Sequence, residues 1–386
     1  MDKLVYLDNN ATTAVAPEVF EVMKPFLTSR YGNPSSIHSF GGRVRADIDL
    51  ARQQVANMLN VSAEEIVFTG CGSESDNTAI MAGLELSSTM KRHIVTTKVE
   101  HEAVIQVGHW LTKKGYEVTE VGVDSKGQLD LDELESAIRE DTALVSVMWA
   151  NNETGVLYPI EKIAEMVKAK GAYFHTDAVQ VAGKIPIDLS KFPVDFLALS
   201  GHKLHAPKGV GILYVRKGID LPPLLHGGHQ EDSRRAGTEN VAGIVGLGAA
   251  AELAVSDLDE VTARESRLRD KLESGILASC KDVRINGVDR IPNTLNVSFE
   301  YVEGESILLM MDDVGICASS GSACTSGSLD PSHVLQAMNV PHSAAHGSIR
   351  FSLSRYTTDQ EIDYVLEQMP PIIERLRAIS PFVPFE

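Results

Sequence analysis

The chain has 386 residues, of which 43% are hydrophobic and 23% charged, and its formal net charge at pH 7 is −18. This composition is ordinary for a globular enzyme, and the length predicts a large domain with a smaller one. So acidic a chain repels phosphate backbones, which argues against nucleic acid as a partner.

The hydropathy of the chain argues against export and membrane insertion. The start, MDKLVYLDNNATT, lacks the basic and apolar regions of a signal peptide, and no run of about 18 apolar residues follows. Cys71, Cys280, Cys317 and Cys324 form no CxxC pair and are too few for a disulfide framework, so neither disulfides nor a metal site is expected. We therefore expect a cytoplasmic protein with thiols that remain free to react.

Short apolar runs alternate with amphipathic stretches through the first part of the chain. A helix is expected at 17–30, and further helical patterns lie at 73–86, 102–115, 131–140 and 160–171. The apolar runs predict seven strands, at 65–70, 93–98, 116–122, 143–149, 172–177, 195–200 and 209–215. This alternation predicts an α/β fold, in which helices cover a mostly parallel seven-stranded sheet.

The pattern changes near residue 240. A long helical stretch, 239–278, leads into a smaller α+β region with strands near 282–286, 294–299 and 347–352 and helices near 303–313, 331–338 and 358–378. We divide the chain into an N-terminal segment 1–15, a large cofactor-binding domain 16–255 and a small C-terminal domain 256–386. The helix at 17–30 is expected to fold back onto the small domain.

Residues 69–77, TGCGSESDN, follow a strand and open a helix. Gly70 and Gly72 let the backbone approach a ligand, Ser73 is expected to cap the helix, and the free N–H groups attract an anion. The functional interpretation is a phosphate cradle, and the structural alternative is a capped helix after a tight turn.

Three further groups of polar residues follow strand ends, where a ligand is expected. His101 is placed to stack on a flat cofactor or to carry protons, unless it faces solvent at a helix start. Asp177 suits the ring nitrogen of a pyridoxal cofactor, with Gln180 in reach of the ring oxygen, although a structural cap is the alternative. In LALSGHKLHAPKG a lysine suits a Schiff base, but the spacing does not choose between Lys203 and Lys208, and both are candidates for surface residues.

Residues 317–328, CASSGSACTSGS, consist almost entirely of small side chains that favour neither helix nor strand. They predict a mobile loop, 318–330, whose thiol at Cys324 enters a site and swings out, or else a surface linker with an incidental cysteine. Cys317 ends an apolar stretch and is expected to be buried and inert.

The order of these groups resembles the aspartate-aminotransferase-like pyridoxal-phosphate enzymes. YLDNNATT, YGNPSSIHSFG, GSESDN, EHEAV, NNETGV, HTDAVQ, SGHKLHAPKG, RRAGTENV and SSGSACTSGSLDPSHVL are similar to the motifs of NifS-type cysteine desulfurases, from about residue 5 to 365. The long cysteine loop resembles the long-loop class. RRAGTEN (234–240) and the short C-terminal tail resemble the nitrogenase-associated branch more than the housekeeping branch.

The resemblance implies a role for each residue around the cofactor ring. Lys203, and not Lys208, matches the Schiff-base lysine. His101 matches the histidine that stacks on pyridoxal phosphate. Asp177 and Gln180 match the partners of the ring nitrogen and the ring oxygen.

The resemblance also implies the contacts to phosphate and substrate. Four residues match the phosphate contacts: Gly72, Ser73, Ser200 and His202. Thr238 matches a phosphate contact donated by the second subunit of a homodimer. Asn152 matches a contact near ring and substrate, and Arg350 matches the clamp on the substrate carboxylate. Cys71 departs from the small residue common at its position and is expected to be buried without a role.

The function implied is that of a cysteine desulfurase. Such an enzyme converts L-cysteine to L-alanine and keeps the sulfur as a persulfide on Cys324, for delivery to an iron–sulfur scaffold protein in cluster assembly, here that of nitrogenase. Lys203 takes the α-proton, and His101 carries protons for the thiol. A selenocysteine lyase, which would not need Cys324, and an inactive assembly partner are the alternatives, and retention of Lys203, Asp177, His101 and Cys324 argues against the second.

Overall fold

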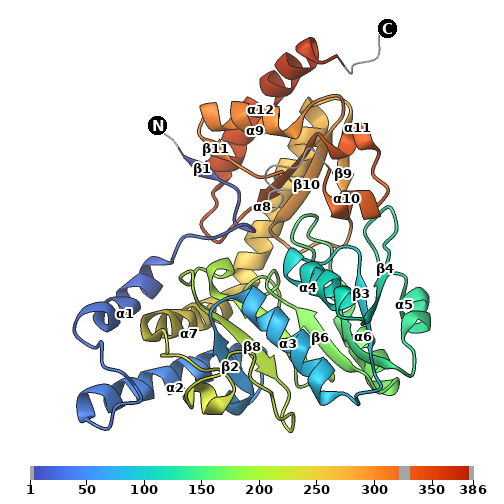
Figure 1. The fold of residues 1–386 in the computed structure, drawn as a ribbon. Coiled ribbons are helices and arrows are strands. Elements are labelled where there is room, and N and C mark those ends of the chain that lie inside the picture. The colour runs from blue at the N-terminus through green and yellow to red at the C-terminus, as the bar shows by residue number, and fades with distance from the viewer. Residues whose placement is uncertain (1–3, 321–330, 382–386) are drawn as a thin grey trace.

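The computed structural model describes residues 4–320 and 331–381 (Figure 1). A large α/β domain carries a smaller domain, and the two meet where the chain crosses between them (Figure 1). Each domain has its own apolar core, one around the large sheet and one beneath the small sheet.

The large domain is built on a seven-stranded sheet in the order β2-β8-β7-β6-β5-β3-β4. The strands are β2 (Ile66–Thr69), β3 (His93–Thr97), β4 (Glu117–Val121), β5 (Thr142–Ser146), β6 (Tyr173–Asp177), β7 (Phe196–Ser200) and β8 (Gly211–Val215). β8 runs antiparallel to both of its neighbours, and the other pairs are parallel. The predicted fold class, a mostly parallel seven-stranded sheet in an α/β domain, is confirmed.

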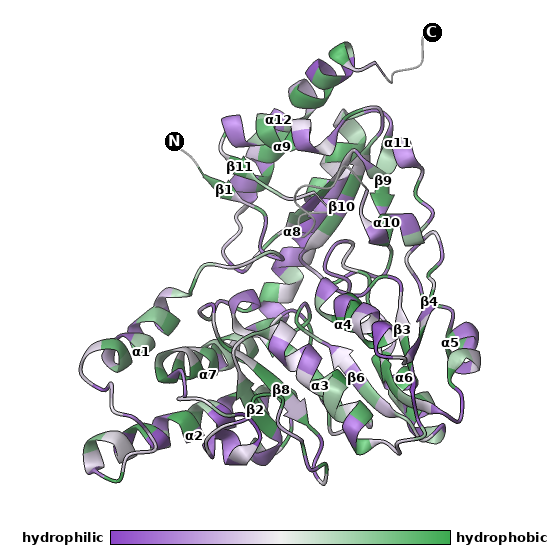
Figure 2. Cartoon of the chain, viewed as in Figure 1, coloured by the Kyte–Doolittle hydropathy of each residue, from purple (hydrophilic) through white to green (hydrophobic). Residues whose placement is uncertain are grey.

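Helices cover both faces of this sheet, as its buried strands require. They are α2 (Ser39–Leu59), α3 (Gly72–Leu86), α4 (Glu102–Lys113), α5 (Leu131–Ala137), α6 (Ile160–Ala169) and α7 (Val241–Ser256). In α6 the buried residues Ile160, Ile163, Ala164 and Val167 recur at helical spacing and form one apolar stripe. Figure 2 shows hydrophobic residues along α7 and on the strands β2 and β8.

The small domain contains a three-stranded antiparallel sheet in the order β12-β10-β9. Its strands are β9 (Val283–Asn286), β10 (Thr294–Phe299) and β12 (Ser348–Ser352), packed with helices α8 (Leu258–Ser279), α9 (Gly304–Asp313) and α12 (Asp359–Ile379). The short helices α10 (His333–Ala337) and α11 (His342–Ala345) follow in sequence but lie on the large-domain core, through residues such as Leu335 and Ala344. The stretch 239–278 forms two helices, α7 and α8, which meet at 75°.

The N-terminal helix α1 (Pro17–Thr28) packs on the large domain, so its expected place on the small domain is wrong. Its apolar residues Val19 and Met23 face α7, where Gly246 has no side chain and lets Met23 approach closely. The N-terminal residues that do join the small domain lie before α1 in the sequence. They form β1 (Val5–Tyr6), which pairs in parallel with β11 (Ile316–Cys317).

Within the described ranges, no single helix is both long and apolar enough to cross a membrane. The bent pair of α7 and α8 passes that test by length and composition.

Candidate active site

A cavity of about 320 Å³ lies at the carboxyl ends of β6 and β7, where the two domains meet. Ten of the predicted site residues line it: Gly72, Ser73, His101, Asn152, Asp177, Gln180, Ser200, His202, Lys203 and Arg350. Thr238 is exposed and does not line this cavity, and Cys324 lies outside the described residues. The fold therefore brings ten residues spread over 279 positions of the sequence, 72 to 350, into one site.

One end of the cavity is formed by the start of α3. Its N-cap is Cys71, in extended conformation and without a side-chain capping bond to the residues that the structure describes. Ser73 lies inside the first turn, so the expectation that it caps the helix is wrong. The helix begins at Gly72, which packs closely against neighbouring side chains. A Cβ at Gly72 would lie 2.9 Å from Val179 Cγ2 and 3.3 Å from Ser200 Cβ.

This end has the properties of an anion site. The N-terminus of a helix carries partial positive charge and unpaired N–H groups. Ser200 ends β7 beside Gly72, and its buried hydroxyl has no hydrogen-bond partner among the described residues. A buried hydroxyl of this kind favours a ligand that accepts a hydrogen bond.

The structure separates the two candidate lysines. Lys203 lies in a short 3-10 turn directly after β7 and lines the cavity. Its Nζ donates to the carbonyl oxygens of Asn10, at 2.6 Å, and Ala11, at 2.7 Å. Lys208 is exposed to solvent five positions further along. Lys203 is therefore the lysine that can meet a ligand in the cavity.

Asp177 is a buried carboxyl group and His101 a half-buried imidazole, and the two influence each other's pKa. Burial raises the pKa of the Asp177 carboxyl, against the effect of His101, and its Oδ1 accepts a hydrogen bond from the Val179 N–H at 2.9 Å. Asp177 thus holds the next turn and also faces the cavity. His101 is the N-cap of α4, where its Nδ1 accepts from the Ala103 N–H at 3.1 Å.

The environment of His101 sets its protonation. Burial lowers the pKa of the imidazole, and Asp177 opposes this effect while Lys203 adds to it. Because Nδ1 accepts a hydrogen bond, the neutral ring carries its proton on Nε2. The neutral ring can therefore donate a hydrogen bond from Nε2, and the cationic ring can give up the proton on this atom.

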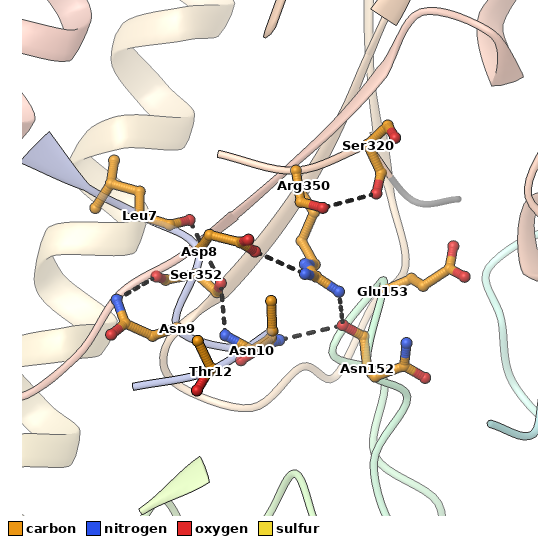
Figure 3. A network of polar contacts seen from close by, with 12 residues as sticks. Leu7, Asp8, Asn9, Asn10, Thr12, Asn152, Glu153, Ser320, Arg350 and Ser352 are labelled. Carbon is orange, nitrogen blue, oxygen red and sulfur yellow. Dashed lines mark hydrogen bonds and ion pairs between the residues drawn. The ribbon is translucent and has the colours of Figure 1, made fainter. Parts of the chain in front are cut away.

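Arg350, on β12, brings a buried positive charge into the cavity from the small domain (Figure 3). Its Nη2 donates to Asp8 Oδ1 at 2.7 Å, and its Nη1 donates to the Asn152 carbonyl at 3.0 Å. Its Nε has no partner among the described residues. The backbone of Arg350 also exchanges hydrogen bonds with Ser319, at the start of the predicted cysteine loop.

Asn10 is a central residue of the site that the sequence did not single out. It is 1% exposed, and its backbone oxygen accepts from both Lys203 Nζ and Gln180 Nε2. Its side chain donates to Thr294 Oγ1 at 2.8 Å, and Figure 3 shows it among residues from both domains. The one signal in the sequence is the run of three polar residues, 8–10, after the apolar residues 4–7, and it lies almost 200 positions before Lys203.

The described cysteines differ from expectation in two cases. Cys71 is exposed and lines the cavity, whereas we expected it to be buried, because the N-cap residue stands free of the helix it precedes. Cys317 is partly exposed, because it sits at the end of the two-stranded β1–β11 sheet. Burial and the nearby Asp312 raise the pKa of the Cys317 thiol, which makes it a poor nucleophile.

Comparison with known proteins identifies the family of the chain. The model of the aminotransferase class-V family matches residues 5–365. The chain belongs to this family. Among curated class-V relatives, the cysteine desulfurase of a Nostoc species is 58% identical over 381 residues, which cover 98% of this chain and 95% of the relative.

Two further comparisons agree with that result. The cysteine desulfurase NifS of Azotobacter vinelandii is 54% identical over 381 residues, which cover 98% of this chain and 94% of the relative. A solved structure described as a NifS-like protein superposes with a TM-score of 0.91 at 43% identity and covers 97% of this chain and 100% of its own.

Proposed function

We propose that the protein is a pyridoxal-phosphate-dependent cysteine desulfurase. It converts L-cysteine to L-alanine and holds the sulfur as a persulfide on Cys324. The observation that carries this proposal is the cavity in which Lys203 and Asp177 of the large domain face Arg350 of the small domain. The names of relatives more than half identical along nearly the whole chain support the same activity.

The residues of the cavity fit pyridoxal phosphate. The phosphate would take the start of α3 at Gly72 and Ser73, the unpaired hydroxyl of Ser200 and the side chain of His202. Asp177 would hold the ring nitrogen, and Lys203 would carry the covalent bond. When bound, the cofactor supplies an electron sink for the bonds broken at the α-carbon of the amino acid.

Each remaining step is carried out by a side chain of the protein. Arg350 binds the substrate carboxylate through its guanidinium and fixes the orientation of the α-carbon. Lys203 Nζ takes the α-proton, and His101 Nε2 moves a proton to or from sulfur. The Cys324 thiolate attacks the substrate sulfur, so the S–S bond forms as the C–S bond breaks. The electron pair of that bond stays on the carbon fragment, which is protonated to alanine.

We extend the proposal to a homodimer, in which Thr238 contacts the phosphate of the other subunit. Thr238 is exposed and outside its own cavity, as a residue donated to a neighbour must be. Exposed apolar side chains on and after α1 offer a surface for that neighbour. They are Phe20, Leu27, Tyr31, Ile37 and Phe40. Analytical sedimentation of the protein should give the mass of a dimer. Thr238→Ala should weaken the binding of the cofactor and leave the dimer intact.

The remaining parts of the proposal concern the cellular role. The persulfide sulfur would pass to an iron–sulfur scaffold protein in the cytoplasm, for cluster assembly in nitrogen fixation. The relative named NifS supports this assignment. A scaffold protein that receives labelled sulfur from the loaded enzyme, but not from Cys324→Ala, would support this role.

The decisive experiment treats the loaded enzyme with L-cysteine and measures alanine and protein-bound persulfide together. Equal amounts of both are expected in a single turnover. Cys324→Ala should bind cofactor and yield neither product, whereas Cys71→Ala and Cys317→Ala should yield both. Alanine formation by Cys324→Ala at the wild-type rate would refute the assigned role of this thiol.

A further inference from the structure

Lys203 borders a second, much smaller cavity besides the one that holds the site. This cavity has a volume of about 30 Å³ and a polar lining that includes Asn9, Thr13, Lys184, Glu265 and Lys203. A space of about 10–15 Å³ on this measure admits one water molecule, and a water needs two to four polar partners. The second cavity is therefore sized and lined for one or two waters.

Two oppositely charged residues face each other across this small cavity. Lys184, after β6 in the large domain, is 7% exposed, and Glu265, on α8 of the small domain, is 4% exposed. Glu265 Oε2 has no hydrogen-bond partner among the described residues. A buried carboxylate oxygen without a partner is costly, so a water that also reaches Lys184 is the natural occupant.

Lys184 is connected to Lys203 by a short chain of hydrogen bonds. Its Nζ donates to Gln180 Oε1 at 3.0 Å and to Asn10 Oδ1 at 3.4 Å. Gln180 Nε2 in turn donates to the Asn10 carbonyl at 3.0 Å, and that carbonyl accepts from Lys203 Nζ. Lys184 therefore fixes the orientation of the Gln180 amide, with its oxygen toward Lys184 and its nitrogen toward the Asn10 carbonyl.

The charges around the pair come from several elements. Burial lowers the pKa of Lys184, with Lys203 and Arg350 acting in the same direction and Glu265 opposing. Burial raises the pKa of Glu265, against the effects of Lys184, Arg264 and Arg355.

His205 also lines the cavity, and burial lowers the pKa of its imidazole to about 4, with Arg355 and Lys184 contributing. The imidazole of His205 is therefore neutral at pH 7. Arg355 also lines the cavity and keeps its positive charge, so a change of charge behind Lys203 comes from Lys184 and Glu265.

We propose that Lys184 and Glu265, with the water between them, form a buried ionisable site that positions Lys203 and sets its affinity for a proton. This inference rests on the proposed function, in which Lys203 must be neutral to take the α-proton. A cation on Lys184 repels a proton on Lys203, and Glu265 moderates that effect. Because Glu265 belongs to the small domain, the packing of the two domains adjusts the basicity of Lys203.

The test measures proton binding by Lys203 in the cofactor-free full-length chain. Competitive acetylation over a pH series, read by mass spectrometry with exposed Lys208 as internal reference, gives the pKa of Lys203. Lys184→Met should raise the pKa of Lys203 by about one unit. At pH values below that pKa, the fraction of neutral amine and hence the rate of acetylation should fall roughly tenfold. Glu265→Gln should shift the pKa in the opposite direction.

Two exposed residues serve as matched controls. Lys191→Met removes a lysine that is 69% exposed, and Glu260→Gln removes a carboxylate of α8 that is 81% exposed. Both should leave the acetylation of Lys203 unchanged. Lys184→Arg keeps the cation and should restore the wild-type value, which a purely structural role would not predict.

Two outcomes overturn the proposal. The first is a wild-type pKa of Lys203 in folded Lys184→Met, and the second is a shift of the same sign in Glu265→Gln. If Lys184→Met does not fold, Glu265→Gln, which keeps the shape of the side chain, decides alone. Failure of the wild type to release alanine from cysteine would instead refute the proposed function and leave the acetylation result intact.

Discussion

Replacement of Arg350 by Gln tests the carboxylate clamp. Arg350 is 4% exposed; its guanidinium forms an ion pair with Asp8 Oδ1 at 2.7 Å and donates a hydrogen bond to the Asn152 carbonyl at 3.0 Å. Its Nε is unpaired within the described residues, so a substrate carboxylate can accept from it or replace Asp8. A hydrogen bond to a charged group contributes about 1.5–3 kcal/mol net. Each such bond lost corresponds to roughly a 10- to 100-fold weaker interaction.

The remaining Asp8 carboxylate should add to this loss. Without Arg350 it would stand unpaired beside the substrate carboxylate, and like charges at close range repel. We therefore expect the KM for L-cysteine to rise about 100-fold in Arg350→Gln while kcat changes far less, because the lost interaction is present in both ground and transition states. The double variant with Asp8→Asn should recover part of the lost affinity.

The assay follows alanine release at increasing L-cysteine, with the cofactor absorbance as a check on loading. Arg267→Gln is the control, because its ion pair with Asp359 is exposed and of little energetic consequence. A KM for Arg350→Gln within a factor of about two of the wild type would refute the clamp. A fall in kcat alone would place Arg350 in the chemical step instead.

Three further predictions concern ionisable groups of the large domain. Lys203→Ala should lose the borohydride-reducible bond to the cofactor, whereas Lys208→Ala should keep it; peptide mapping that finds the bond at another lysine would contradict the assignment. Asp177→Asn should retain the cofactor but turn over at least about 100-fold more slowly, because the charge that holds the ring nitrogen is gone; wild-type turnover would remove it from this role. Burial raises the pKa of Glu100 from 4.5 to about 8, so the native state keeps a proton that the unfolded state loses. The stability from this proton is complete below pH 4.5 and is lost as the pH rises through about 8. Denaturant titrations at about pH 5 and about pH 8 give the loss of unfolding free energy over this range. That loss should be about 1–3 kcal/mol smaller in Glu100→Gln than in the wild type. Equal losses in the two proteins would show that Glu100 is ionised throughout.

Much of the architecture could be predicted from local patterns. Six of the seven strands of the large sheet are short buried runs, and the seventh, the edge strand β4, is largely exposed. The helix α6 buries one stripe of apolar residues at helical spacing. Such periods are visible in any single sequence, because each element must bury one face whatever it packs against. The placement of α1 could not be predicted this way. The apolar stripe of α1 indicates only that one face of the helix is buried. The structure shows that this face packs on α7, where Gly246 has no side chain and Met23 comes close.

The sequence by itself determined which residue types follow the strand ends, and so that Asp177, His101 and a lysine near 203 belong to one site. Spacing left Lys203 and Lys208 equivalent, and the family resemblance matched Lys203. The sequence did not single out Asn10, Asp8 or Lys184, and only the tertiary structure placed these residues at the site. Exposure and hydrogen bonds between residues nearly 200 positions apart depend on how the two domains pack, and no local period records which side chains will meet across that junction.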